Sequence, residues 1–460
     1  MKKVDMKKLI ILMILGLCSI GSSIYILYGL SLLSGIETVI RILFSITIVL
    51  ITLILCLSFI KSLRKKKSKY LLYIPFVFIY CFILILFGYY IIKTYKAIDK
   101  LTTSDTTYSS SLVSLADNKA TSLDNLKSGK IGMVDDENNV IGYQVPKEII
   151  NENKIKNEII EYESYIDIIN ALYDKEIEYG FLPTNYAVMF ENMEEVDFST
   201  IRDDTKIIYT KDKTVQNETV NSKSTLDKPF TILLMGVDSE NESIAGSSFN
   251  GDSLILFTFN PNTLSSTILS IPRDSYVPIM CFAGHKRNKI THAAWYGESC
   301  MMSTIENFTG IPIDYFIKIN FKGVVKLVDT LGGVEVDVPY AFCEQDSNRK
   351  FGNNTIYVEQ GLQILNGEQA LAFARNRHTW PQYCPAKYSN YISNDFIRGQ
   401  NQQTVIRALL NKFKEINSLD TVYSLLDTIG TSMQTNMTTN EILSLYNIAK
   451  DILVKNSGQN

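Results

Sequence analysis

The stretch Phe230-Thr-Ile-Leu-Leu-Met-Gly-Val-Asp238 decides the fold of the C-terminal half of the chain. It is an apolar run of the length and composition of a buried strand, and it ends on a carboxylate. A second apolar run follows Asn250-Gly-Asp252, and a third leads into Ser270-Ile-Pro-Arg273-Asp274. A charged side chain at a strand end can leave the core without burying its charge alone. The pattern predicts strand ends that gather charged groups around one ligand.

The rest of this C-terminal half mixes short strand-like runs with segments of helical spacing. Strands are expected at 231–237, 253–260, 266–271, 315–320 and 334–338. Helices are expected at 289–309, 322–331, 366–376, 395–415, 420–431 and 440–454, with Gly332-Gly333 stopping the second. Mixed strands with flanking helices predict an α/β fold with a central mixed sheet covered on both faces.

Three apolar stretches open the chain, at 9–33, 39–60 and 70–92. Each is about as long as the ~20 residues that a membrane-spanning helix needs. Lysines precede the first stretch, and a basic loop separates the second from the third, so the positive-inside rule places both in the cytoplasm. We read the basic loop as a topology signal rather than a lipid-headgroup site. Three spans predict a multi-pass cell-membrane protein with the residues after about 93 outside the cell.

Between the membrane segments and the C-terminal domain, the pattern predicts a small extracellular α/β domain. Strands are expected at 130–134, 179–182 and 206–209, and a helix at 154–172. The segment loosely resembles half of a periplasmic solute-binding domain, but it carries no ligand-binding motif. We interpret it as a spacer or packing module.

Six segments follow from these patterns. They are a three-helix membrane anchor (1–95), a Ser- and Thr-rich juxtamembrane linker (96–127), the accessory α/β domain (128–210), a polar linker (211–228), the C-terminal α/β domain (229–416) and C-terminal helices (417–460). The net charge of −3 gives no basic field over the whole chain, so nucleic acid is not an expected partner.

The chain has seven cysteines, and four of them lie in the polar C-terminal half. These four are Cys281, Cys300, Cys343 and Cys384. Outside the cell they can form two disulfides, with three connectivities open. A zinc site is the alternative, which the absence of any Cys-x-x-Cys spacing disfavours.

Two carboxylates mark the predicted strand ends. Asp238 follows one strand and Asp252 precedes the next, so both could hold Mg²⁺ together with phosphate oxygens and water. The alternative for each is an aspartate that caps a turn. No Gly-x-Ser-x-Gly motif, P-loop or nucleophile–histidine pair is present.

Several cations also lie at element ends. Arg273 follows a strand, Arg375 and Arg377 lie near the end of a helix, and Lys289 opens one. Asp395, Arg398 and Gln402 share one helical face, because they are three and four residues apart. A lone arginine is usually a surface ion pair, but several at element ends favour a phosphate or pyrophosphate site.

In this order and spacing, the segments resemble the LytR-CpsA-Psr family of cell-wall ligases over about 229–414. The segments that carry the resemblance are Leu-Met-Gly-Val-Asp238, Asp252 with Thr-Phe-Asn-Pro261, Leu-Ser-Ile-Pro-Arg273-Asp, Asn288-Lys289-Ile, Ala-Trp-Tyr-Gly297, Glu306-Asn-Phe-Thr-Gly, Val-Asp329-Thr-Leu-Gly-Gly, Ala-Phe-Ala-Arg375-Asn-Arg377 and Asp395 to Gln403.

The resemblance implies an α/β/α domain with a hydrophobic channel for a polyprenyl chain. It implies transfer of a glycopolymer, such as teichoic acid or capsule, from an undecaprenyl-pyrophosphate carrier to a muramic-acid hydroxyl of peptidoglycan, forming a phosphodiester, with a possible pyrophosphatase side activity. Asp238 and Asp252 would position Mg²⁺ (or Mn²⁺). The pyrophosphate would be bound by Arg273, Lys289, Arg375, Arg377, Arg398, Gln402 and Asp395, and the catalytic residues would be Asp252, Arg273, Arg375 and Arg377.

Two positions depart from the family pattern. Asn250 stands where an arginine is usual, and Asn401 stands where the last motif usually has another. The first departure keeps open an alternative function, a non-catalytic polyprenyl-pyrophosphate-binding or scaffold protein. A membrane-linked transcription regulator is disfavoured, because the predicted topology leaves no DNA-binding fold in the cytoplasm.

Overall fold

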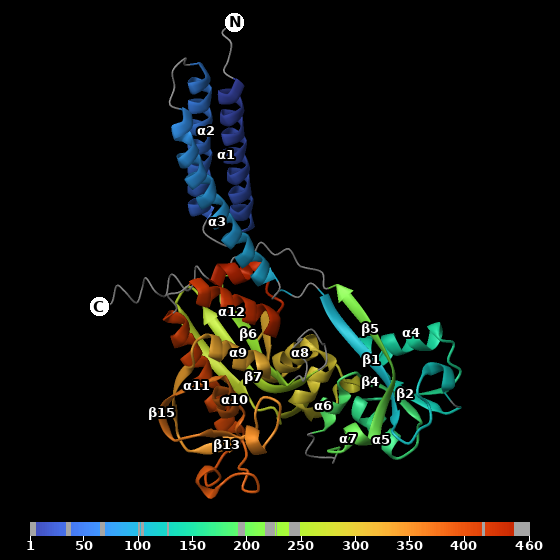
Figure 1. Cartoon of the computed structure of the whole chain (residues 1–460). Coiled ribbons are helices and arrows are strands. Elements are labelled where there is room, and N and C mark those ends of the chain that lie inside the picture. Colours follow the sequence, from blue (N-terminus) through green and yellow to red (C-terminus); the bar gives the residue numbers. More distant parts are fainter. Residues whose placement is uncertain are drawn as a thin grey trace. The chain divides into compact units, whose positions relative to one another are not determined.

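A computed structural model describes residues 6–33, 38–64, 70–99, 102, 105–126, 128–191, 198–216, 226, 228–238, 249–415 and 419–445 (Figure 1). The chain divides into two compact units. One comprises residues 1–102, 221–228 and 437–460, and the other comprises 103–220 and 229–436.

The first unit contains the three apolar helices α1 (Met6–Leu32), α2 (Thr38–Arg64) and α3 (Tyr73–Asp99). Each is 27 residues long and apolar enough to cross a membrane, so the three expected stretches do form helices of spanning length. Hydroxyl groups join all three helices: Ser23 Oγ lies 2.7 Å from Thr52 Oγ1, which lies 2.8 Å from the Tyr80 hydroxyl. In a membrane, the lipid is as apolar as the helices, so the hydrophobic effect does not drive helices together. Hydrogen bonds between helices, like these, then contribute to their association. Which side of the membrane each end faces stays a prediction.

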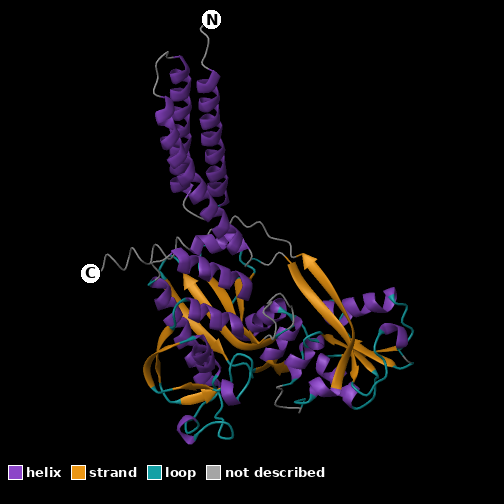
Figure 2. Ribbon diagram, viewed as in Figure 1, coloured by secondary structure: helices purple, strands orange, loops and turns teal. Residues whose placement is uncertain are grey.

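The second unit begins with the accessory domain, a five-stranded sheet of order β3-β2-β4-β1-β5. Figure 2 draws strands in orange and helices in purple. Strand β2 pairs in parallel with β3 and β4, while β1 pairs antiparallel with β4 and β5. The strands are β1 (Asp105–Leu115), β2 (Lys130–Val134), β3 (Glu158–Tyr162), β4 (Tyr179–Pro183) and β5 (Thr205–Gln216). The helices are α4 (Val145–Glu152), α5 (Tyr165–Tyr173), α6 (Tyr186–Phe190) and α7 (Ile201–Asp204).

Both linker predictions are wrong where these strands lie. Strand β1 occupies 105–115 of the juxtamembrane linker, and β5 extends to Gln216 into the polar linker. Serine and threonine suit β1 because their hydroxyls pair across the sheet: Ser111 Oγ lies 2.8 Å from Thr184 Oγ1 and 2.7 Å from Thr210 Oγ1.

The single helix expected at 154–172 is also wrong. Its first part is β3, and α5 begins only at Tyr165. The Ser164 side chain caps α5 by accepting a hydrogen bond from the Asp167 amide, and this starts the helix after the strand. The apolar residues before Ser164 belong to strand β3, which pairs with β2, and not to a helix.

The C-terminal domain is built on a second five-stranded sheet of order β16-β11-β6-β7-β8. Strands β6 and β11 are parallel, and the other pairs are antiparallel, so the expected mixed sheet is confirmed. The strands are β6 (Phe230–Asp238), β7 (Asn250–Asn260), β8 (Ser265–Ile271), β11 (Tyr315–Asn320) and β16 (Met433–Thr435). The short edge strand β16 was not expected from the sequence.

The two faces of this sheet serve different purposes. Leu233 and Leu256 belong to a buried core that includes residues of α8 (Glu298–Thr309). Leu234 pairs in register with Ile255 on one side and Ile317 on the other, and all three line a cavity on the opposite face. Strand alternation therefore divides one apolar run between a buried core and the wall of a cavity.

Helices α9 (Phe321–Thr330), α10 (Gly367–Arg375), α11 (Asp395–Lys414) and α12 (Leu419–Ser432) complete the domain (Figure 1). The remaining strands are β9 (Tyr276–Pro278) with β10 (Arg287–Lys289), β12 (Val334–Val338) with β15 (Gly361–Leu365), and β13 (Phe342–Glu344) with β14 (Ile356–Val358). Glycines at 332 and 333 follow α9 at φ of 77° and 93°, as the expected helix stop requires. Of the last expected helix, 440–454, only residues up to 445 are described, and they are helical.

The helix expected at 289–309 is broken. A 3-10 segment at Ile290–Tyr296 precedes α8, and Gly297 separates them at a φ of 92°. That backbone conformation is open to glycine and costly for other residues, so the helix restarts after it.

Both disulfides are formed, Cys281 with Cys300 and Cys343 with Cys384. The structure thereby selects one of the three connectivities and contradicts the zinc alternative, since all four thiols are used.

Candidate functional site

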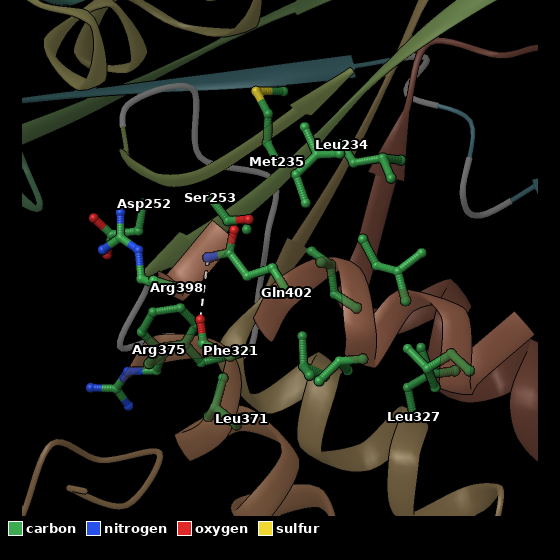
Figure 3. A pocket seen from close by; sticks show the side chains of 18 of the residues that line it. Leu234, Met235, Asp252, Ser253, Phe321, Leu327, Leu371, Arg375, Arg398 and Gln402 are labelled. Atoms are coloured by element: carbon green, nitrogen blue, oxygen red, sulfur yellow. Dashed lines mark hydrogen bonds between the residues drawn. The ribbon is translucent and has the colours of Figure 1, made fainter. Parts of the chain in front are cut away.

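A cavity of about 470 Å³ lies between the sheet and helices α9, α10 and α11. One face of α11 runs along it, with Arg398, Gln402, Val405, Leu409 and Phe413 at helical spacing. The polar residues occupy the N-terminal turns and the apolar residues follow them. The cavity therefore has a charged end and an apolar end, and Figure 3 shows Asp252, Arg375 and Arg398 far from Leu327.

The apolar end is formed by aliphatic and aromatic side chains from the sheet, α9 and α11. They are Leu234, Ile255, Ile317, Ile319, Val324, Leu327, Val405, Ile406, Leu409, Leu410, Phe413 and Met433. Such a lining binds a long hydrocarbon chain through the hydrophobic effect and offers it no polar partner.

The charged end gathers arginines from four separate segments of the C-terminal domain. Five arginines line it: Arg273, Arg349, Arg375, Arg377 and Arg398. Arg273 forms an ion pair with Asp252, and Arg398 forms one with Asp395. Guanidinium groups concentrated at one end of a cavity favour a ligand with two or more phosphates.

Asp274 is the centre of the ion pairs at this end. Its Oδ1 lies 3.3 Å from Lys289 Nζ, and its Oδ2 lies 3.6 Å from Arg377 Nη1. Burial alone would raise the pKa of this carboxyl, but the charges of Arg273, Lys289 and Arg377 together lower it below its ordinary value. Asp274 thus stays ionised and holds three cations in place.

Arg375 is held by its surroundings before any ligand arrives. Its guanidinium lies 4.6 Å from the Phe321 ring centroid, and its Nη1 donates a hydrogen bond of 3.2 Å to the Asp346 carbonyl. Burial lowers the pKa of Arg375, as it does that of Arg398, although Asp395 counteracts part of the effect at Arg398.

The amide side chains after Arg398 anchor α11. Gln402 Nε2 donates to the Ala374 carbonyl at 3.2 Å, which Figure 3 marks with a dashed line. Asn401 Nδ2 donates to the Phe373 carbonyl at 3.2 Å, and Gln403 Nε2 donates to Ser270 Oγ at 2.8 Å. The bonds from Gln402 and Asn401 fix the end of α10, where Arg375 lies, and the bond from Gln403 joins α11 to β8.

The structure brings most of the expected site residues together. Those that line the cavity are Asp252, Arg273, Arg375, Arg377, Arg398 and Gln402. Asp395 and Lys289 reach it through ion pairs, the first with Arg398 and the second with Asp274. Lys289 ends strand β10 and pairs with a carboxylate, where the sequence had placed it at the start of a long helix.

Asp238 ends β6, where its backbone pairs with Asn250, but its side chain lies outside the described residues. Among the residues described, no three His, Cys, Asp or Glu side chains cluster to hold a metal. Mg²⁺ commonly takes one or two carboxylates and completes its shell with phosphate oxygens and water. Asp252, at the charged end, could supply one carboxylate ligand to Mg²⁺, and a bound phosphate would have to supply others.

Sequence patterns missed several residues at this end of the cavity. Glu344, His378 and Trp380 line it, and they lie in the segment closed by the Cys343–Cys384 disulfide. Glu344 Oε2 accepts a hydrogen bond of 3.3 Å from Trp380 Nε1, and burial raises the pKa of this carboxyl. The two cysteines were a signal in the sequence that this segment could fold against the site.

His292 is buried beside the site but is not a good proton acceptor there. Its ring stacks on Trp295 at 3.9 Å, and Nδ1 lies 2.9 Å from Asn288 Oδ1. Burial, followed by the charges of Arg273 and Lys289, lowers its pKa to about 3. The imidazole is therefore neutral at physiological pH.

Asn250, where an arginine was expected, joins the accessory domain to the site. Its Nδ2 donates to the Val188 carbonyl at 3.2 Å, and its Oδ1 accepts from Trp295 Nε1 at 2.9 Å. Nearby, Tyr296 stacks on Tyr165 with ring centroids 5.1 Å apart. Tyr165 opens α5 just after β3, at the edge where open α/β sheets bind ligands. Trp295 and Tyr296 of the C-terminal domain join the apolar core around Tyr165, which is the kind of contact that a packing module makes.

The profile of the LytR_cpsA_psr family matches residues 195–456, which is more than half of the chain. Teichoic acid transferase TagU of Bacillus licheniformis, named as polyisoprenyl-teichoic acid–peptidoglycan teichoic acid transferase, is 34% identical over 224 residues, covering 48% of this chain and 65% of that protein. TagV of Bacillus subtilis, with the same activity in its name, is 31% identical over 235 residues, covering 51% and 56%.

The chain thus spans less than two thirds of the length of these two relatives. Among solved structures, B. subtilis TagV is similar at 30% identity and a TM-score of 0.39, covering 48% of this chain and 79% of that one. A structure described as TagT bound to LI-WTA is similar at 28% identity and a TM-score of 0.37, covering 50% and 77%.

Proposed function

Because the chain belongs to the LytR_cpsA_psr family, we propose that it is a membrane-anchored transferase. It moves a glycopolymer from a polyprenyl-pyrophosphate carrier, undecaprenyl pyrophosphate in the simplest case, to peptidoglycan. The single observation that carries the proposal is the cavity with one apolar end and one end lined by five arginines. An amphipathic donor with a long hydrocarbon chain and a pyrophosphate matches both ends.

In the proposed reaction, an acceptor hydroxyl of peptidoglycan attacks the phosphorus that carries the polymer. A new P–O bond forms, the bond to the bridging oxygen breaks, and polyprenyl monophosphate leaves with the electron pair. The hydroxyl proton passes first to a carboxylate such as Asp252 and finally to the leaving phosphate. The products are a phosphodiester-linked polymer and polyprenyl monophosphate, so atoms and charge balance.

The arginines would act by position and charge. Arg273, Arg375, Arg377 and Arg398 neutralise the pyrophosphate and the charge that develops on the leaving group. Their ion pairs and the Gln402 hydrogen bond set their positions beforehand, which lowers the reorganisation needed during reaction. Bound Mg²⁺ or Mn²⁺, held by Asp252 and Asp238 with the donor phosphates, would supply further neutralisation.

The names of the relatives favour teichoic acid as the polymer. A capsule polymer would present the same pyrophosphate, and water in place of the acceptor would give pyrophosphatase activity. The predicted topology would place the site outside the cell membrane, where peptidoglycan is available.

Polymer transfer by the purified full-length protein in lipid vesicles tests this function. The wild-type protein should transfer lipid-linked polymer to peptidoglycan fragments. Arg273→Ala should reduce the transfer rate at least about 100-fold, because removing one group that stabilises transition-state charge typically costs this much. Donor binding without transfer or hydrolysis by the wild type would instead support the non-catalytic binding protein.

A further inference from the structure

Arg349 lines the charged end of the cavity but belongs to none of the segments that first indicated the site. It lies in the turn 346–350, between β13 and β14. The Asp346 carboxylate accepts hydrogen bonds from the amides of Asn348 at 3.0 Å and Lys350 at 2.8 Å. Arg349 itself has a φ of 59°, a left-handed conformation uncommon for a residue other than glycine. Such conformations persist where the surroundings fix them, and they concentrate at functional sites.

The turn is attached to both ends of α10. At the first turn of the helix, Glu368 accepts a hydrogen bond of 2.8 Å from the Ser347 amide. At the last residue, Arg375 Nη1 donates to the Asp346 carbonyl at 3.2 Å. Arg349 is therefore held by the same helix that positions Arg375.

Three like charges come together at this point. Burial and the neighbouring charge of Arg375 lower the pKa of Arg349 to about 10, with Arg377 adding to the effect. The guanidinium is still protonated at neutral pH, so the cavity concentrates positive charge. Glu191 of the accessory domain offsets part of this lowering of the Arg349 pKa, while Arg202, its ion-pair partner at 3.1 Å, adds to it. An anion with several charges at this end would relieve the repulsion.

The cation expected at position 250 is absent, because Asn250 bonds to the accessory domain and to Trp295. We propose that Arg349 binds the donor pyrophosphate in this protein and supplies the positive charge that position 250 lacks. This assignment rests on the proposed function. It makes the turn 346–350 part of the binding site.

Binding of two lipid probes to the full-length protein in detergent micelles tests the assignment. The probes are octaprenyl pyrophosphate and octaprenyl monophosphate. Arg349→Ala should weaken pyrophosphate binding about 10- to 100-fold and weaken monophosphate binding much less, because one phosphate is missing from the second probe. Arg349→Lys should recover part of the affinity. Arg407→Ala is the matched control, since Arg407 is exposed on α11.

Three results would overturn the assignment. If Arg273→Ala weakens pyrophosphate binding but Arg349→Ala does not, the proposed function stands and Arg349 has no part in it. If Arg349→Ala weakens both probes equally and lowers the melting temperature, its role is structural. If the wild type binds neither probe, the proposed function fails as well.

Discussion

Trp295 Nε1 donates a hydrogen bond of 2.9 Å to Asn250 Oδ1, two residues before Asp252. Both side chains are buried, and Trp295 packs edge-on against Phe190 of the accessory domain, with ring centroids 5.2 Å apart. The position where an arginine was expected is therefore an interface residue. A substitution at Asn250 therefore changes the contact between the two domains as well as the charge near the site.

Asn250→Ala should lower the free energy of unfolding by about 1–3 kcal/mol, because the Trp295 indole N–H would remain buried without its acceptor. Asn250→Arg should destabilise more, since the larger side chain and its charge do not fit the buried space. Thermal unfolding of the full-length protein measures both changes. A stable Asn250→Arg variant with increased polymer transfer would show that the asparagine is merely a lost site cation.

Asp274→Asn should loosen Lys289 and Arg377 and reduce polymer transfer at neutral pH about 10-fold or more. The folded state lowers the pKa of Asp274 below the ordinary 3.8, so its stabilising contribution is present above that pH and is lost as the pH falls below it. The carboxylate is partly exposed, so screening limits the contribution to about 1 kcal/mol.

Melting temperatures of Asp274→Asn and wild type should therefore differ at pH 7 and converge below about pH 3.8. Asp337→Asn is a suitable control, because Asp337 is exposed on β12. A difference in melting temperature that stays constant across this range would count against an ion-pair role for Asp274.

Leu409→Trp should fill part of the apolar end of the cavity. We expect octaprenyl pyrophosphate to bind at least about 10-fold more weakly, while a probe with a short geranyl chain keeps its affinity, because the charged end is unchanged. Titration of both probes measures this difference. Arg407→Trp, at an exposed position of the same helix, should leave both affinities unchanged; equal losses in the two tryptophan variants would argue against a hydrocarbon site.

The disulfide joins Cys343 and Cys384, 41 positions apart, and the segment it closes contributes Glu344 and Trp380 to the cavity. Replacing both cysteines by alanine should lower stability by about 2–4 kcal/mol. It should also weaken pyrophosphate binding, because the turn that carries Arg349 lies within the closed segment. Thermal unfolding and probe binding measure these effects.

Thiol titration of the denatured chain gives an independent check on both disulfides. Without reductant, only Cys18, Cys56 and Cys81 should react, and after reduction all seven cysteines should react. Seven reactive thiols in the unreduced protein would contradict the structure and remove the basis for a disulfide-closed segment.

Features encoded by local spacing were predictable. The apolar spans follow from length and composition alone. Residues 315–320 and 334–338 form strands at the expected bounds, because turn residues and alternation define them. Arg398 and Gln402 share a face of α11 because helical geometry requires it. The sequence by itself therefore determined three apolar helices long enough to span a membrane, the mixed α/β sheet and most of the residues at the charged end.

Tertiary structure alone decided which distant residues meet. Asp274 binds cations from β10 and from the end of α10, and Asn250 bonds to an accessory-domain carbonyl 62 residues away in sequence. Strand β1 is a strand because β4 and β5 satisfy its backbone and hydroxyl groups, although its composition is that of a linker. Arg349 reaches the cavity only because α10 holds its turn at both ends. Such contacts form only when segments far apart in the chain come together, and the spacing of side chains along the sequence does not predict them.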